Sequence, residues 1–203
     1  MPARCRRANA PMPCPARAPT FIPRPRPRAP ASHAGATRRD SRLVELTADM
    51  QRVVLEQSLG FVATVTADGR PNLSPKGTTT VLDERHLMFA DIASPRTVEN
   101  LATNPSVEVN VVDPIVRKGF RFKGTARILE EGELFEQIVT FYRRAGSTSP
   151  IRAVVLIRVE RALQLTSPAY DSGASEESIR ARWETYYGEV RTRAVEASGR
   201  PRG

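Results

Sequence analysis

The chain has 203 residues, enough for one domain with extensions, and it carries 31 basic and 22 acidic residues. The basic surplus lies at one end: residues 1–39 hold nine arginines and no acidic residue, which accounts for the whole formal net charge of +9. The remaining residues are formally neutral, so the charge is a poor argument for a nucleic-acid-binding core. No run approaches the ~18 apolar residues of a membrane span. Both cysteines, Cys5 and Cys14, lie within the first 14 residues, and the lack of cysteine beyond them fits a reducing cytoplasm.

The first 40 residues form an Arg/Pro-rich segment without the apolar periodicity that a packed core requires, and we predict that it is disordered. Three interpretations stay open. The segment is an upstream extension from a misassigned start, with Met50 or a nearby codon as the true beginning, or a basic arm for anionic partners, or a transit-like sequence. We therefore expect an N-terminal extension over 1–40, a folded domain over 41–170, and a C-terminal helix with a frayed tail over 171–203.

The patterns of the folded part predict antiparallel hairpins with helices between and around them. In the first helix Thr47 is the candidate cap and Gly60 the candidate stop. The ranges with strand patterns are 61–66, 71–77, 78–82, 85–90, 107–112, 120–129 and 151–165, and those with helix patterns are 43–57, 94–103, 131–144 and 176–187. No βαβ alternation is present, so we predict a mainly β fold with helices, a small antiparallel barrel flanked by helices.

The return strand of the first hairpin, residues 71–77, is unusually poor in apolar side chains. It offers Asn72, Ser74, Lys76 and Gly77, and it contains Pro75, which the middle of a sheet tolerates poorly. Such a strand either faces a ligand or lies at a sheet edge facing water.

A second candidate for binding is the segment from Phe89 to Leu101, which begins as a strand, breaks after Asp91 and restarts as a helix at Ser94. Ser94 is a suitable N-cap, and the N–H groups after a cap commonly bind phosphate. Arg96 adds a cation that opposes the helix dipole, a conflict that a bound anion resolves. The alternative is an ordinary capped surface helix.

Several chemistries lack the residues that they need. The only histidines are His33 and His86, and we expect His86 at a surface or strand end. Neither a zinc cluster nor a Ser-His-Asp triad is credible, and we find no Walker loop and no Gly-x-Gly-x-x-Gly motif. No metal is therefore expected. A chain without these groups still works as an enzyme when a cofactor carries the chemistry.

Taken in order, several segments resemble the pyridoxamine 5′-phosphate oxidase-like flavoproteins, which have a flavin mononucleotide (FMN)-binding split β-barrel. The resemblance covers about residues 43–165. The segments that carry it are Phe61 to Thr66, Asp68-Gly69-x-Pro71, Ser74-Pro75-Lys76-Gly77, Phe89-Ala90-Asp91, Ser94-x-Arg96-Thr97-x-x-Asn100-Leu101, Asn104-Pro105 and Arg121-Phe122-Lys123-Gly124-Thr125-Ala126. The expected fold is a small antiparallel split β-barrel flanked by helices.

The resemblance implies a homodimer with FMN bound at the interface between the subunits. Basic residues of the second strand and of the helix start hold the FMN phosphate in this family, and Lys76 and Arg96 match them, joined by Ser94 and Thr97. The segment Phe89-Ala90-Asp91 is expected to run beside the flavin through backbone contacts. Asn72, Ser74 and Gly77 are expected to line the isoalloxazine and ribityl side.

The chain also departs from the vitamin B6 oxidases, which carry Arg and His for their substrate near the C-terminus. Residues 164–171 contain no histidine, so pyridoxamine phosphate is not the expected substrate. Where those enzymes place a flavin-contacting Gln, this chain has Lys118-Gly119-Phe120, and Phe120 packs either on the cofactor or in the core.

The function we expect is an FMN-dependent oxidoreductase acting on an unknown small substrate, with no catalytic residue identified. The alternatives are an F420-dependent reductase on the same fold, a flavin-binding or sensing protein without turnover, and a small nucleic-acid-binding barrel that uses the basic arm. The neutral remainder of the chain weighs against the last of these.

Overall fold

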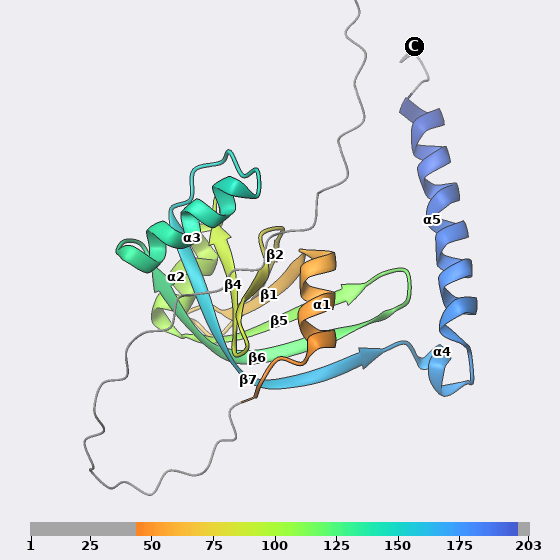
Figure 1. Cartoon of the computed structure of the whole chain (residues 1–203), viewed down its shortest axis with the longest axis horizontal. Helices are drawn as coiled ribbons and strands as arrows, with labels where there is room; N and C mark the ends of the chain where they lie inside the picture. Colours follow the sequence, from red (N-terminus) through yellow and green to blue (C-terminus); the bar gives the residue numbers. More distant parts are fainter. Residues whose placement is uncertain (1–43, 199–203) are drawn as a thin grey trace, which may run out of the picture.

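The computed structural model describes residues 44–198, so the predictions made for 1–43 and 199–203 lie outside the described residues. Seven strands and five helices occur in this part (Figure 1). The strands are β1 (Gly60–Val65), β2 (Pro71–Lys76), β3 (Thr80–Asp83), β4 (His86–Asp91), β5 (Ser106–Asp113), β6 (Lys118–Leu129) and β7 (Ala153–Thr166). The helices are α1 (Ala48–Gln57), α2 (Pro95–Thr103), α3 (Glu133–Arg144), α4 (Pro168–Asp171) and α5 (Glu176–Ser198).

The seven strands form one antiparallel sheet in the order β2-β1-β5-β6-β7-β4-β3. The sheet curves strongly but does not close, because β2 and β3 at its two edges are not paired with each other. This arrangement confirms the predicted mainly β fold with helices, an antiparallel split barrel. None of the helices between residues 44 and 198 is both long and apolar enough to cross a membrane.

Two hydrophobic clusters hold the sheet together. The larger fills the barrel interior, where Val53 and Val54 of α1 pack with inward side chains such as Val109 and Phe122. The smaller lies beneath α3, where Ile138 contacts the other side of β4 and β7. Strand β4 and the first five residues of β7 are thus covered on both faces, whereas β1 alternates between buried and more exposed positions.

The ends of α1 show one prediction confirmed and one that was wrong. Thr47 is the N-cap, and its hydroxyl accepts a hydrogen bond from the Met50 N–H at 3.3 Å. The helix stops at Ser58, in the left-handed conformation with φ 51°, rather than at Gly60. Gly60 instead begins β1, where a Cβ atom would lie only 2.5 Å from Oγ1 of Thr79. A close approach of two chain segments, and not a helix end, therefore requires this glycine.

Helix α5 is longer than predicted, because it continues beyond Tyr187 to Ser198. It stands apart from the barrel and joins it through α4 at the end of β7 (Figure 1). Its base is anchored: Ile179 is buried, and the Arg117 guanidinium lies 3.4 Å from the ring centre of Trp183. Only the first turns of α5 are therefore fixed to the barrel by these contacts.

Candidate functional site

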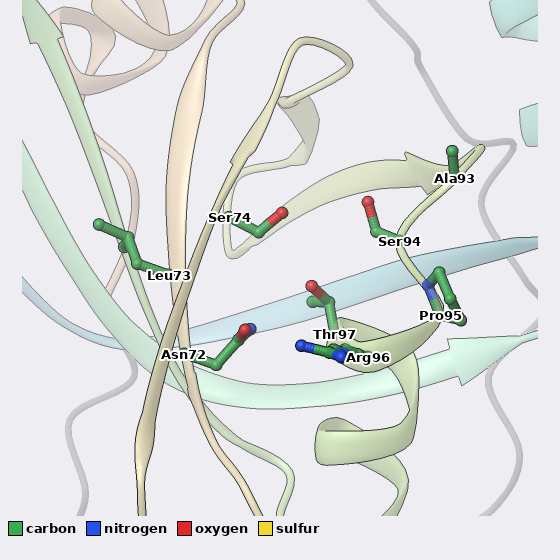
Figure 2. Close-up of a pocket in the computed structure, with 8 residues that line it drawn as sticks. All are labelled: Asn72, Leu73, Ser74, Ala93, Ser94, Pro95, Arg96 and Thr97. Carbon is green, nitrogen blue, oxygen red and sulfur yellow. The ribbon is translucent and has the colours of Figure 1, made fainter.

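Strand β2 and the N-terminal turn of α2 enclose a surface pocket of about 300 Å³ (Figure 2). Five of the ten predicted site residues line it, and they come from two segments that are separated by β3 and β4 in the sequence. The lining residues are Asn72, Leu73, Ser74, Ala93, Ser94, Pro95, Arg96 and Thr97. The polar strand and the helix start, selected separately from the sequence, thus meet at one place.

The position of β2 at a sheet edge explains both its polarity and its proline. An edge strand is paired on one side only, here with β1, so the missing N–H of Pro75 breaks no central ladder. Side chains alternate along a strand, and Figure 2 shows Asn72 and Ser74 on the α2 side of β2 while Leu73 points to the opposite side. The strand is therefore an edge strand, as one interpretation predicted, and its polar side lines a pocket, so the ligand-facing interpretation stays a prediction.

Lys76, the last residue of β2, connects the two walls of the site. Its side chain is 4% exposed, and its ammonium donates hydrogen bonds to Oγ of Ser74 at 2.6 Å and to Oγ1 of Thr97 at 3.3 Å. The same nitrogen lies 5.7 Å from the ring centre of Phe89. A single buried cation thus touches the strand, the helix start and the end of β4.

The electrostatics of Lys76 are unusual for a lysine. Burial lowers its pKa below the usual 10.5, and the nearby Asp91 carboxylate opposes this shift only in part. Within residues 44–198 no carboxylate lies close enough to Lys76 to form an ion pair with it. A buried charge that no ion pair compensates fully is costly, so this position favours the approach of an anion.

The start of α2 differs from the predicted cap. Ser94 occupies the N-cap position, but its side chain makes no capping hydrogen bond, and it lines the pocket instead. The predicted N-cap position is therefore confirmed, although the Ser94 hydroxyl does not cap the helix. The turn is held by Asp91, whose buried carboxylate accepts the Ser94 N–H at 2.9 Å. Arg96 is exposed at the pocket, while Thr97 is buried and bonded to Lys76.

The remaining predicted residues lie behind or beside the pocket. Phe89 is fully buried in the barrel cluster, and Ala90 is 3% exposed in the cluster under α3. The Ala90 N–H donates to Oγ1 of Thr78 at 3.0 Å, and the same hydroxyl donates to the Ala90 carbonyl oxygen at 3.1 Å. Gly77 is exposed directly after β2. Phe120 takes the second of its two predicted places, in the core, at 6% exposure.

Sequence reasoning missed the polar residues that support the pocket from within. The Thr64 hydroxyl of β1 accepts hydrogen bonds from the side-chain amides of Asn72, at 3.1 Å, and Asn100 of α2, at 2.9 Å. Thr64 is 2% exposed, so this hydroxyl is fixed inside the barrel. The available signal was Thr64 itself, a polar residue at an inward position of an apolar strand.

Known proteins confirm the class of fold. Residues 46–166 match the family model described as pyridoxamine 5′-phosphate oxidase. The match covers more than half of the chain and includes both walls of the pocket. The chain therefore belongs to the pyridoxamine 5′-phosphate oxidase family, as the sequence resemblance implied.

Several individual proteins are also similar to this chain. HupZ of Group A Streptococcus is 33% identical, with a TM-score of 0.55, and the alignment covers 60% of this chain and 94% of that one. A putative pyridoxamine 5′-phosphate oxidase from Lactobacillus delbrueckii is 26% identical, with a TM-score of 0.52 and coverage of 60% and 96%. An uncharacterized protein of Methanocaldococcus jannaschii is 32% identical over 93 residues. That alignment spans 45% of this chain and 61% of the archaeal protein.

Proposed function

We propose that this chain is an FMN-binding flavoprotein and that it acts as an oxidoreductase on a small substrate. The single observation that supports the cofactor best is Lys76, a buried cation that forms no ion pair within the described residues and is hydrogen-bonded to Thr97 at the start of α2. Phosphate groups are bound at helix N-termini through N–H groups and nearby cations. The donor set here, with Lys76, Arg96 and the hydroxyls of Ser94 and Thr97, fits a phosphate monoester.

In this proposal each residue has a defined task. Lys76 and Arg96 hold the phosphate by charge-assisted hydrogen bonds, with Ser94 and Thr97 as neutral partners. Asn72 and Ser74 line the adjoining part of the pocket, where the rest of the cofactor lies. Bound FMN supplies hydride-transfer chemistry at its ring system, and the protein contributes binding and orientation. The homodimer with the cofactor at its interface is part of the same proposal.

The phosphate assignment has a direct test, because riboflavin is FMN without its phosphate. We expect the purified protein to take up FMN, with flavin absorption that stays with the protein during gel filtration at dimer size. Each charge-assisted hydrogen bond contributes about 1.5–3 kcal/mol. Two such bonds predict that riboflavin binds more weakly than FMN by a factor of roughly 100 or more.

The outcomes separate the alternatives. Equal affinity for FMN and riboflavin would contradict a phosphate site at Lys76 and Arg96, even if the protein binds flavin. Failure to take up FMN, followed by uptake of F420 in a parallel titration, would replace FMN by the deazaflavin. Oxidation of NADPH by the FMN-loaded protein, measured by the loss of its absorption, tests for turnover.

A further inference from the structure

The exposed large hydrophobic side chains within the described residues fall into only two groups. One group lies on or next to the strands β1, β2 and β5, and the other lies on α5. The first comprises Leu59, Phe61, Leu73 and Val112, and the second comprises Tyr186, Tyr187, Val190 and Val195. We call the first group the outer sheet patch.

The outer sheet patch is one continuous face, because its members share sheet positions that point away from the barrel interior. Phe61 pairs with Pro75 of β2 on one side and with Asn110 of β5 on the other. Leu73, which is 66% exposed, stands opposite Ala63 and next along this face. Directly opposite residues of an antiparallel pair project to the same side of the sheet. Figure 2 shows the side chain of Leu73 on the opposite side of β2 from Asn72 and Ser74.

Helix α5 carries side chains that supply apolar cover for this face. Tyr186, Tyr187 and Val190 lie three, four and seven residues after Trp183, which places all four along one side of the helix. We call them the α5 stripe. Tyr186 is 47% exposed, and tyrosine combines a large apolar ring with a hydroxyl donor. Beyond its base the stripe has no cover from its own barrel, because α5 stands apart from it in Figure 1.

We propose that two copies of this chain exchange these helices, so that the α5 stripe of each subunit packs on the outer sheet patch of the other. This inference rests on the homodimer of the proposed function and adds the element that makes the contact. Family membership does not imply it, because the family match ends at residue 166, before α5 begins. The anchored base of α5, with Arg117 stacked on Trp183, holds the helix away from its own sheet.

Size and symmetry suit this arrangement. A helix of 23 residues is about 34 Å long, which reaches well beyond its own barrel. In a twofold dimer the contact between α5 and the outer sheet patch occurs twice. Each of these two contacts therefore needs to bury only about 600–1,000 Å² for the whole interface to reach standard size. Aromatic residues at the centre of such a contact are typical of interfaces.

The exchange has a consequence for the cofactor site, because β2 has the pocket on one side and the patch on the other. Asn72, Ser74 and Lys76 face inward from a strand that is hydrogen-bonded to a single neighbour, β1. When the partner's helix packs against Leu73 and Pro75, it restricts the motion of β2 from the face opposite the pocket. The partner's α5 thereby positions the pocket residues without touching them. A change that weakens the dimer should therefore also weaken cofactor binding.

A photo-crosslink tests the contact without any flavin. We would replace Tyr187 by p-benzoylphenylalanine, irradiate the full-length protein, and look for a covalent dimer on a denaturing gel. The expected product joins α5 to the tryptic peptide Val53–Lys76, which contains both strands of the hairpin because trypsin does not cleave between Arg70 and Pro71. The same probe at Thr185, on the opposite side of the helix, should give little of this product. A crosslink between two α5 helices, a purely intramolecular product or no covalent dimer would overturn the proposal.

A matched pair of variants tests the coupling. Substitution of Tyr186, Tyr187 and Val190 by serine should raise the dimer dissociation constant at least tenfold in sedimentation experiments and weaken FMN binding several-fold. The control, Thr185→Ser with Thr192→Ser, changes the other side of α5. It should leave the dimer dissociation constant and the FMN affinity unchanged. An intact dimer in the triple variant would overturn the helix exchange. A wild-type protein that shows the crosslink but binds no FMN would contradict the proposed function alone.

Discussion

The two edge hairpins of the sheet follow the same plan but differ in how they are covered. Strand β3 is buried along almost its whole length and β4 along all but its first residue, because the barrel interior lies on one side of this hairpin and α3 on the other. In β2, at the opposite edge, only Lys76 is buried. The comparison shows where the fold leaves freedom: a strand that contributes little to the core can place Asn, Ser and Lys at a binding site.

The largest expected effect comes from substitutions that remove the proposed phosphate-binding cations at the β2 edge and the start of α2. The double variant Lys76→Ala/Arg96→Ala should lose several kcal/mol of FMN affinity, since each charge-assisted hydrogen bond contributes about 1.5–3 kcal/mol. Its far-ultraviolet circular dichroism should remain that of the wild type, because β2 adds little to the core. Isothermal titration with FMN measures the affinity. Full retention of FMN by a folded double variant would disprove the phosphate site.

The second prediction contrasts a glycine of the central strands with one at the edge. A Cβ atom on Gly124 would lie 2.0 Å from the Arg158 carbonyl oxygen, beside the irregular pairing of β6 with β7. Gly124→Ala should therefore lower the free energy of unfolding by roughly 1–3 kcal/mol, as is typical of overpacking. Gly77→Ala has open space around it and should change stability by less than about 0.5 kcal/mol. Urea unfolding curves of the two variants measure both values, and equal effects would contradict the comparison.

These two edges also show what the sequence could and could not predict. Turn residues and apolar runs are local signals, so the first hairpin and the Thr47 cap of α1 were predicted correctly. Ser94 is the predicted N-cap, but the sequence could not show that the turn is held by Asp91, because this contact depends on the tertiary position of Asp91. Burial of Lys76 was also out of reach, since it depends on α2 and β4 closing around the end of β2.

The third prediction concerns the hydrogen bond between α3, which covers the β3–β4 hairpin, and the turn that follows β2. The hydroxyl of Tyr142 on α3 donates to the Thr78 carbonyl oxygen at 2.8 Å, and burial raises the pKa of this tyrosine well above its usual range. Tyr142→Phe removes the donor and leaves that carbonyl oxygen without this partner, at a cost of about 1 kcal/mol. Tyr186→Phe on the exposed side of α5 is the matched control for stability and should have no measurable effect at concentrations where the protein is monomeric. Thermal unfolding of both variants distinguishes them.

The smallest effect is a pH dependence that belongs to the β2 edge alone. Burial lowers the pKa of Lys76 in the folded protein below its ordinary value of 10.5, so the folded state binds this proton more weakly than the unfolded chain does. The resulting penalty is present in full at pH values below the folded pKa, and it disappears as the pH rises past 10.5. Lys76→Met should therefore be more stable than the wild type at neutral pH in the absence of ligand, with the difference shrinking toward pH 10.5.

Bound phosphate reverses this order, because the anion stabilises the charged lysine. With FMN present, the wild type should gain more stability than Lys76→Met at neutral pH, as measured by urea unfolding with and without the cofactor. Arg96→Met, at an exposed position, should reduce the gain from FMN without raising the stability of the free protein. If Lys76→Met were destabilising in the free protein at neutral pH, the lysine would act as a structural residue held by Ser74 and Thr97, and the polar edge would not be free for binding.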